Sequence, residues 1–343
     1  MLFVSSKGTD GAVGSGKIMI SVIIPALNAA PFIAECLRSA ILQDYPGNYE
    51  IIVIDQDKTG ETRQALHPFL QRIVYLFSAH ANSAAARNLG IEHAAGDLIA
   101  NLDADDVWES NALSSMAAKL EPDIDVVFPN ARLFGNAAVE GKLFRDSYPA
   151  RRPVTFEDVA SRTTFVAGGA LYRRQVCERA GCYDPSLSCG IDFDLWLRML
   201  KAGAVFDFID APVYRYRVHS GQITAQPSIQ RFDQVAAIYQ KHLRLSGPVT
   251  LAQEQALRFG LEKILAAKAL EQAKIAIGSG DHDTARAALA LANRHYNRTK
   301  LRIIGLGLAI APSALTWLYR VMRGSPETPV PASARGAVRL GDG

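Results

Sequence analysis

The chain has 343 residues, of which 49% are hydrophobic and 21% are charged. That length and balance are typical of a folded soluble protein with one large domain or two smaller ones. The formal net charge of +3 is too small to indicate binding to nucleic acid, so we expect no such partner.

Apolar runs alternate with helical patterns over the first hundred or so residues. The runs are rich in β-branched residues, which predicts buried strands, and the segments between them place apolar residues at helical spacing. This alternation is typical of a parallel sheet covered on both faces, so we expect an α/β fold, a Rossmann-like sandwich with a mostly parallel central sheet. We expect strands at residues 19–25, 50–55, 73–77 and 97–102, and helices at residues 29–43, 62–71 and 83–95.

The pattern is more mixed after residue 125 and becomes helical after residue 226. The run from Gly278 to Asp281 predicts a turn with Asp281 as the N-cap of the following helix. The expected strands are residues 126–129, 168–172, 204–209 and 213–218, and the expected helices are residues 156–162, 175–180, 193–202, 228–244, 251–278 and 283–296.

These changes of pattern divide the chain into a flexible leader, an α/β domain, a C-terminal helical region and a disordered tail. The leader spells most of a phosphate-binding P-loop and ends in Lys17, but Ile18 replaces the hydroxyl residue and a strand follows where a helix is needed. The four parts are residues 1–18, 19–225, 226–325 and 326–343.

Carboxylates follow two of the expected strands. Asp55 ends one strand, and Asp103 begins an acidic segment that also contains Asp105 and Asp106. Ligands of open parallel sheets lie beyond the carboxyl ends of strands. In an extended segment alternate residues share a face, so we expect Asp103 and Asp105 to share a face, with one of them reaching toward a nucleotide and the other toward a divalent cation.

Several short segments between residues 19 and 222 resemble, in this order and spacing, a family 2 glycosyltransferase with a GT-A fold. The similar segments are Ser21-Val22-Ile23-Ile24-Pro25-Ala26-Leu27-Asn28, Ser39 with Gln43, Glu50-Ile51-Ile52-Val53-Ile54-Asp55, Ala86-Arg87-Asn88 with Gly90, Asp103-Ala104-Asp105, Ala180-Gly181-Cys182-Tyr183-Asp184 and Asp192-Phe193-Asp194-Leu195-Trp196-Leu197-Arg198.

The resemblance implies that residues 19–225 are a catalytic domain that transfers a sugar from a nucleotide-diphosphate donor, expected to be a UDP-sugar, with inversion of the anomeric centre. The acceptor is a hydroxyl of a glycan or lipid-linked glycan. Asp192 is the expected general base, and Asp105 with His219 is expected to hold Mn²⁺ or Mg²⁺. The residues expected to bind the donor are Pro25, Asn28, Asp55, Arg87 and Asp103. For Arg87 a salt bridge to an acidic residue is an equal alternative to contact with the pyrophosphate.

Three positions depart from the family pattern. Gln56 stands where a second acidic residue is usual, which affects nucleotide contacts. Ile191 replaces the glutamate that commonly precedes the base, which affects acceptor positioning. Asn82 replaces a glycine, a milder change because asparagine tolerates turn conformations.

The C-terminal region is basic and partly apolar. Residues 284–326 contain seven Lys/Arg and no acid, and residues 303–319 carry no charge. We expect either peripheral contact with an anionic membrane surface through residues 284–326, or two ordinary amphipathic helices packed on the catalytic domain. The expected location is therefore the cytoplasm or the inner face of the cytoplasmic membrane, in cell-envelope polysaccharide biosynthesis.

Two other classes of protein share parts of this pattern. A sugar-phosphate nucleotidyltransferase needs a glycine-rich basic loop after the first strand, and residues 26–30 contain neither glycine nor a basic residue. A catalytically degenerate module that binds a sugar nucleotide, or scaffolds polysaccharide assembly, is favoured by Gln56 and Ile191 and opposed by Asp103, Asp105 and Asp192.

Overall fold

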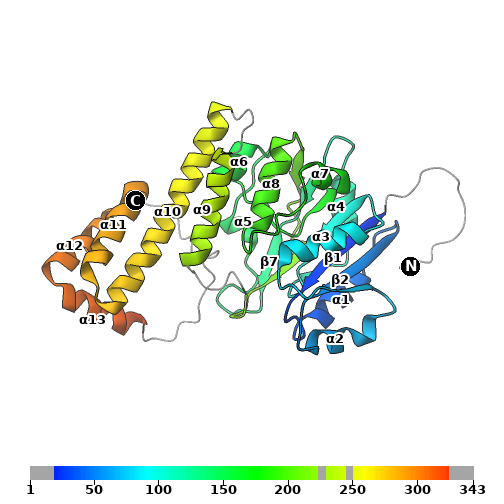
Figure 1. Ribbon diagram of the computed structural model, residues 1–343, viewed down its shortest axis with the longest axis horizontal. Helices are drawn as coiled ribbons and strands as arrows, with labels where there is room; N and C mark the ends of the chain where they lie inside the picture. The colour runs from blue at the N-terminus through cyan, green and yellow to red at the C-terminus, as the bar shows by residue number, and fades with distance from the viewer. Residues whose placement is uncertain (1–18, 223–228, 245–249, 324–343) are drawn as a thin grey trace, which may run out of the picture. The chain divides into compact units, whose positions relative to one another are not determined.

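The computed structural model describes residues 19–222, 229–244 and 250–323. The chain divides into two compact units, which we call unit 1 (Met1–Val159 with Thr163–His219) and unit 2 (Ala160–Arg162 with Ser220–Gly343). The leader (1–18) and tail (326–343) expected from the sequence lie outside the described residues. Figure 1 shows the elements of both units in chain order.

Unit 1 is built on a seven-stranded sheet in the order β3-β2-β1-β4-β8-β6-β9. The first four of these strands are parallel, β8 runs antiparallel to both of its neighbours, and β9 is parallel to β6. The expected mostly parallel central sheet is therefore confirmed. The strands are β1 (Ile20–Ala26), β2 (Tyr49–Asp55), β3 (Val74–Phe77), β4 (Leu98–Asn101), β6 (Val126–Phe128), β8 (Leu171–Arg173) and β9 (Phe206–Phe208).

Helices cover this sheet. Because β1 and β2 are buried along nearly their whole length, both of their faces need apolar partners. Helix α3 packs closely on these strands (Figure 1), and a Cβ added at Gly90 would lie 2.8 Å from Ile23 and 2.9 Å from Ile54. The helices of unit 1 are α1 (Ile33–Ile41), α2 (Glu61–Leu66), α3 (Ser83–His93), α4 (Ala112–Lys119), α5 (Phe144–Ser147), α6 (Phe156–Ala160), α7 (Arg174–Arg179) and α8 (Ile191–Lys201), with a 3₁₀ turn at His67–Phe69.

A second, three-stranded sheet was not expected as such from the sequence. It consists of β5 (Val107–Trp108), β10 (Tyr214–Arg217) and β7 (Ala131–Phe134), with β10 in the middle. The short β5 directly follows the acidic segment, and its Val107 pairs with Arg215 of β10. This pairing brings the end of β10, and His219 beyond it, to the acidic segment.

Unit 2 is helical in its described residues, as expected. Thr250 and Gln253 form a capping box at the start of α10, and Gly280 ends that helix in the left-handed conformation. Asp281 accepts a hydrogen bond from the backbone N–H of Thr284, which confirms it as an N-cap. The helices are α9 (Ile229–Arg244), α10 (Leu251–Ser279), α11 (His282–Tyr296), α12 (Thr299–Ile310) and α13 (Pro312–Arg323).

The uncharged stretch at residues 303–319 does not form one continuous helix. It divides between α12 and α13, because Ala311 leaves the helical conformation and Pro312 cannot continue the preceding hydrogen-bond ladder. Among the residues described, no helix is both long and apolar enough to cross a membrane.

Candidate active site

The first group of expected donor-binding residues lies at the carboxyl ends of β1 and β2. Ala26 of β1 pairs with Asp55 of β2, so the turn after β1 and the Asp55 carboxylate share one edge of the sheet. Pro25 lies within β1, half-buried, and Asn28 lies in the following turn, exposed and with a φ of 51°. Asparagine tolerates this left-handed conformation better than most residues, which fits its place in the turn.

Asp55 is fully buried, and both of its carboxylate oxygens accept hydrogen bonds. Oδ1 accepts from the backbone N–H of Asp57 at 2.9 Å, and Oδ2 accepts from the hydroxyl of Tyr75 at 2.9 Å. Burial together with the bond to Asp55 raises the pKa of Tyr75 to about 12. A carboxylate has about four acceptor positions, so Asp55 retains acceptor capacity for a further N–H or O–H group.

The acidic segment is a turn, not the extended strand that the sequence argument assumed. Residues 104 and 105 form the turn, and the backbone N–H of Asp106 donates to the carbonyl of Asp103. The expectation that Asp103 and Asp105 share a face through strand alternation is therefore wrong. The turn instead gives the three carboxylates three different partners.

Asp103 pairs with Arg87. The guanidinium of Arg87, which is 4% exposed, contacts Asp103 Oδ1 at 2.5 Å and also donates to the hydroxyl of Ser83. The salt bridge that the sequence left open for Arg87 is thus present. Loss of hydration raises the pKa of Asp103. The positive charge of Arg87 opposes this rise, while the negative charges of Asp105 and Asp192 add to it. The Asp103 side chain is 41% exposed, so hydration limits this rise.

Asp105 lies beside His219, with Oδ2 of the carboxylate 3.1 Å from Nε2 of the imidazole. The two residues are 114 positions apart in sequence, and β10 brings them together. Across the parts of the chain that the structure describes, no cluster of three or more His, Cys, Asp or Glu side chains suits a metal ion. One carboxylate and one imidazole nevertheless fit a Mn²⁺ or Mg²⁺ ion whose other ligands are phosphate oxygens and water.

Asp106 has a different environment from its two neighbours. It is 1% exposed, and its oxygens accept hydrogen bonds from the Tyr214 hydroxyl at 2.8 Å and from the backbone N–H of Arg217 at 2.7 Å. These bonds attach the acidic segment to β10. Sequence reasoning did not separate this carboxylate from Asp103 and Asp105.

Asp192 lies in the first turn of α8, where the helix dipole favours a negative charge. Its Oδ1 atom is buried and has no hydrogen-bond partner among the described residues. A Cβ added at Gly168 would lie 3.1 Å from Oδ2, so only a residue without a side chain leaves this approach open. Asp192 acts electrostatically on Arg87 and Asp103, which places it in the same charged group.

The three departures from the family pattern have structural explanations. Gln56 is buried and its amide donates to the carbonyls of His80 and Asn82, bonds that a carboxylate cannot make. Asn82 caps α3 by accepting from the N–H of Ala85 at 2.8 Å. Ile191 is 6% exposed and packs in the interior.

Asn88 is a residue whose role sequence reasoning missed, although it belongs to a quoted motif. Its side-chain amide exchanges two hydrogen bonds with the backbone of Tyr183, at 2.8 and 2.9 Å. The Tyr183 hydroxyl in turn accepts a hydrogen bond from the side-chain amide of Asn101 at 2.6 Å. These bonds connect α3 and β4, on the side of Arg87 and Asp103, with the segment that precedes Asp192.

The sequence model described as "Glycosyl transferase family 2" matches residues 21–181. Within this segment the chain is a family 2 glycosyltransferase. It is 29% identical over 207 residues to an uncharacterized glycosyltransferase, YwdF, of Bacillus subtilis, which covers 56% of this chain and 75% of YwdF. It is 34% identical over 127 residues to the Escherichia coli UDP-Glc:alpha-D-GlcNAc-diphosphoundecaprenol beta-1,3-glucosyltransferase WfgD, covering 36% of this chain and 50% of WfgD.

Solved structures support the GT-A fold of this glycosyltransferase. The crystal structure of S. aureus TarS 1-349 with UDP-GlcNAc matches with a TM-score of 0.59 at 16% identity, over 90% of this chain and 92% of that one. The mannosyltransferase PcManGT from Pyrobaculum calidifontis, in complex with GDP-Man and Mn²⁺, matches with a TM-score of 0.57 at 20% identity, over 90% and 84%. At these identities the likeness shows the fold.

Proposed function

We propose that this glycosyltransferase moves a sugar from a nucleotide-diphosphate donor to an acceptor hydroxyl with inversion, and that residues 19–225 carry the chemistry. The observation that carries the proposal is Asp192, a carboxylate with a buried oxygen that has no partner among the described residues, in the same charged group as Arg87 and Asp103. A general base needs such a free acceptor position beside its substrate.

The donor nucleotide is assigned to the edge of the sheet that holds Pro25, Asn28 and Asp55. Asp55 accepts a hydrogen bond from the base or ribose, since it retains acceptor positions beyond the two it uses in the fold. Asp103 binds the ribose, and Arg87 supplies positive charge toward the pyrophosphate while it remains paired with Asp103. WfgD, a relative named for a UDP-Glc donor, favours a uridine nucleotide.

Asp105 and His219 would hold a divalent cation, Mn²⁺ or Mg²⁺, through the carboxylate and imidazole atoms that lie 3.1 Å apart. When bound, such a cation stabilises the negative charge that develops on a departing diphosphate. The PcManGT complex contains Mn²⁺, which supports this assignment.

Asp192 takes the proton from the acceptor hydroxyl. As the oxygen–hydrogen bond breaks, the acceptor oxygen forms a bond to the anomeric carbon, and the bond from that carbon to the diphosphate breaks with its electron pair on the diphosphate. One displacement of this kind inverts the anomeric centre and needs one base, not a carboxylate pair.

The acceptor is proposed to be a glycan or lipid-linked glycan of cell-envelope polysaccharide, on the cytoplasmic side of the membrane. WfgD is named for a diphosphoundecaprenol-linked acceptor, and another relative, WcaA of Escherichia coli, is named for colanic acid biosynthesis. The degenerate module is the second candidate. Its support weakens because Gln56 is held by backbone carbonyls and Ile191 is buried, so both departures serve packing.

The test is turnover of a panel of UDP- and GDP-sugars with Mn²⁺, in which release of the nucleotide diphosphate is measured. We expect Asp192→Asn to lose at least about 100-fold in turnover while it binds the donor nucleotide nearly as well as the wild type. Asp123→Asn, an exposed aspartate of the same unit, is the matched control and should keep full turnover. Wild-type turnover by Asp192→Asn would show that Asp192 is not the base. Donor binding without turnover of any sugar favours the module.

A further inference from the structure

The last two helices of unit 2 carry apolar side chains on both of their sides. One side of each packs inside the unit, where Leu308, Leu315 and Tyr319 join a cluster with α10 and α11. The other side holds six large apolar side chains that are 50% to 75% exposed: Ile303, Leu306, Ile310, Trp317, Leu318 and Val321. We call these six the apolar face.

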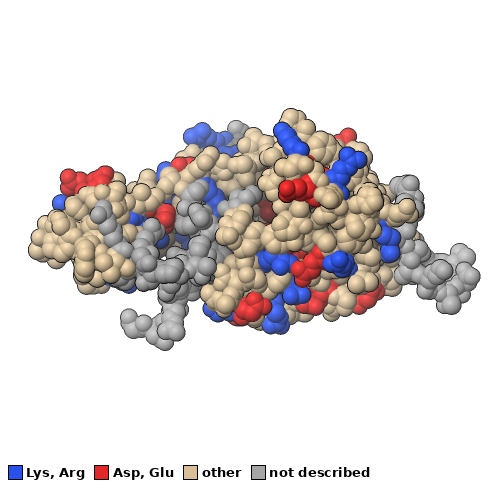
Figure 2. Space-filling model, turned by 90° about the horizontal axis from the view of Figure 1, so that it is seen from below, with Lys and Arg blue, Asp and Glu red and all other residues tan. Residues whose placement is uncertain are grey.

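The spacing of the apolar face follows the helical repeat. Within α12 its members are three, four and seven positions apart, and within α13 Val321 is four positions from Trp317 and three from Leu318, so they lie on one side of each helix. Figure 2 shows a mainly tan surface, with few charged side chains, on the part of unit 2 drawn at its left side. A large exposed apolar surface of this kind marks an interaction site.

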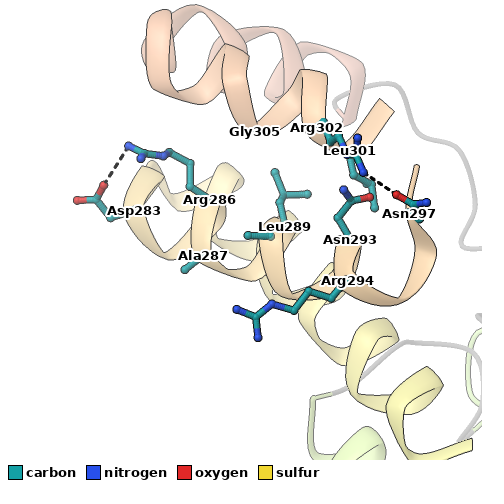
Figure 3. A pocket seen from close by; sticks show the side chains of 11 residues that line it. Asp283, Arg286, Ala287, Leu289, Asn293, Arg294, Asn297, Leu301, Arg302 and Gly305 are labelled. Carbon is teal, nitrogen blue, oxygen red and sulfur yellow. Dashed lines mark hydrogen bonds and ion pairs between the residues drawn. The ribbon is translucent and has the colours of Figure 1, made fainter. Parts of the chain in front are cut away.

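An arginine-lined groove lies beside the apolar face, between α11 and α12, with a volume of about 820 Å³. Leu289 points into its middle (Figure 3), and the other residues that line it include Leu301, Arg286, Arg294 and Arg302. The volume falls within the range of small-molecule sites. On α12, Arg302 lies one position from Ile303, at the border between the groove and the apolar face.

The groove has an excess of positive charge. Its single acid, Asp283, is 3.7 Å from Arg286, and the Asp283 side chain is 98% exposed. Arg302 donates to the amide of Asn297 at 2.6 Å, a neutral partner. Arg294 is exposed and contacts no acidic side chain within the described residues. Residues 284–326 as a whole contain seven Lys/Arg and no acid.

We propose that unit 2 docks on an anionic phospholipid bilayer: the apolar face enters the interface, and the groove between α11 and α12 holds the phosphate of an anionic lipid headgroup. Apolar side chains beside Arg294 and Arg302, which contact no acidic side chain among the described residues, match the two layers of such an interface, acyl chains and phosphates. The complementary charge favours a lipid surface over a second copy of this positively charged region, because two such copies repel. This inference does not depend on the proposed catalytic residues.

The experiment is co-sedimentation of the full-length protein with vesicles of phosphatidylcholine, with and without about 30% phosphatidylglycerol. We expect binding to the anionic vesicles and little binding to phosphatidylcholine alone. Arg286→Gln with Arg294→Gln should weaken binding by about 25-fold, because each arginine near the surface contributes about five-fold. The matched control, Arg179→Gln with Arg258→Gln, removes two exposed arginines elsewhere and should keep binding within about two-fold.

The apolar face is tested separately. Ile310→Ser with Trp317→Ser should lose about ten-fold or more in binding to the same vesicles. Leu42→Ser with Leu251→Ser changes two side chains that are each 71% exposed, away from the face, and should bind as the wild type does. Because the changed residues are exposed, all variants should keep wild-type donor turnover and wild-type unfolding midpoints.

Three results would overturn the proposal. The first is that the wild type fails to sediment with anionic vesicles. The second is that the groove and face variants bind as well as their controls. The third is a change of oligomeric state in the face variants, measured by sedimentation velocity, which would assign the face to a second copy. A failure of donor turnover in every variant and in the wild type would concern the proposed function and leave the vesicle result standing.

Discussion

The guanidinium of Arg87 lies 2.5 Å from the carboxylate of Asp103, and the arginine is buried whereas the aspartate is 41% exposed. A buried guanidinium without a counter-charge is strongly unfavourable. Asp103 therefore stabilises the fold by neutralising Arg87, in addition to any contact it makes with a ligand. Asp103 therefore faces Arg87 on one side and retains an accessible surface on the other.

This double role makes a prediction about Asp103→Ala. The variant should lose about 2 kcal/mol of unfolding free energy, because the buried Arg87 loses its charged hydrogen-bond partner. It should also bind UDP more weakly. Urea unfolding and calorimetric titration with UDP measure the two effects. Unchanged stability would mean that Arg87 finds another partner when Asp103 is absent.

Asp105→Ala and His219→Ala should behave differently from Asp103→Ala. Each removes one proposed cation ligand from a partly exposed pair, so stability changes little while UDP affinity measured with Mn²⁺ falls about 10-fold or more. Affinity measured with EDTA should stay at the wild-type value. His93→Ala, an exposed histidine on α3, is the matched control. Equal losses with Mn²⁺ and with EDTA would contradict the assignment of this pair to a cation.

Gln56→Glu should destabilise the protein by about 2 kcal/mol at neutral pH. In the wild type, the Gln56 amide donates to the carbonyls of His80 and Asn82. The glutamate keeps the shape of the side chain but places a charged acceptor, which cannot donate, beside these carbonyls. Gln64→Glu on the exposed side of α2 makes the same change of charge without buried partners. If both variants unfold at the same urea concentration, the Gln56 amide does not support the loop before α3.

Asp57 provides a pH dependence with a defined sign. Hydrogen bonds from Thr62 and Thr59 lower its pKa to about 2, from an ordinary value of 3.8. A lowered folded pKa contributes stability that is present above the unfolded pKa and is lost as the pH falls from 3.8 toward 2. Between about pH 5 and pH 2.5, the wild type should lose its stability advantage over Asp57→Asn, as followed by urea unfolding. A constant difference between the two proteins across that range would contradict this.

The alternating part of the fold was predictable from the sequence because its signals are local. The strands of the parallel half of the sheet are apolar runs, and their predicted bounds agree with β1, β2, β3 and β4 to within two residues. Asp55 and Asp103 were found by the same reasoning, since they follow those runs directly.

Other features depend on contacts between distant residues, which no local pattern carries. The two-residue β5 forms only because β10, more than a hundred positions away, pairs with it. The separate environment of Asp106 likewise depends on a distant residue, because Tyr214 donates to it across 108 positions. The long helix expected at residues 29–43 is shorter, because residues 30–32 form a turn that α1 follows.

The paired hydrogen bonds between Asn88 and Tyr183 have a kinetic consequence. Asn88 is the neighbour of Arg87 on α3, so one turn of helix sets the separation between the donor side of the centre and the segment leading to Asp192. A shorter or apolar side chain at position 88 would leave each substrate its own contacts. The substitution would change the distance between the bound donor and the bound acceptor. Productive alignment of the two would then become rarer, although neither one binds less tightly.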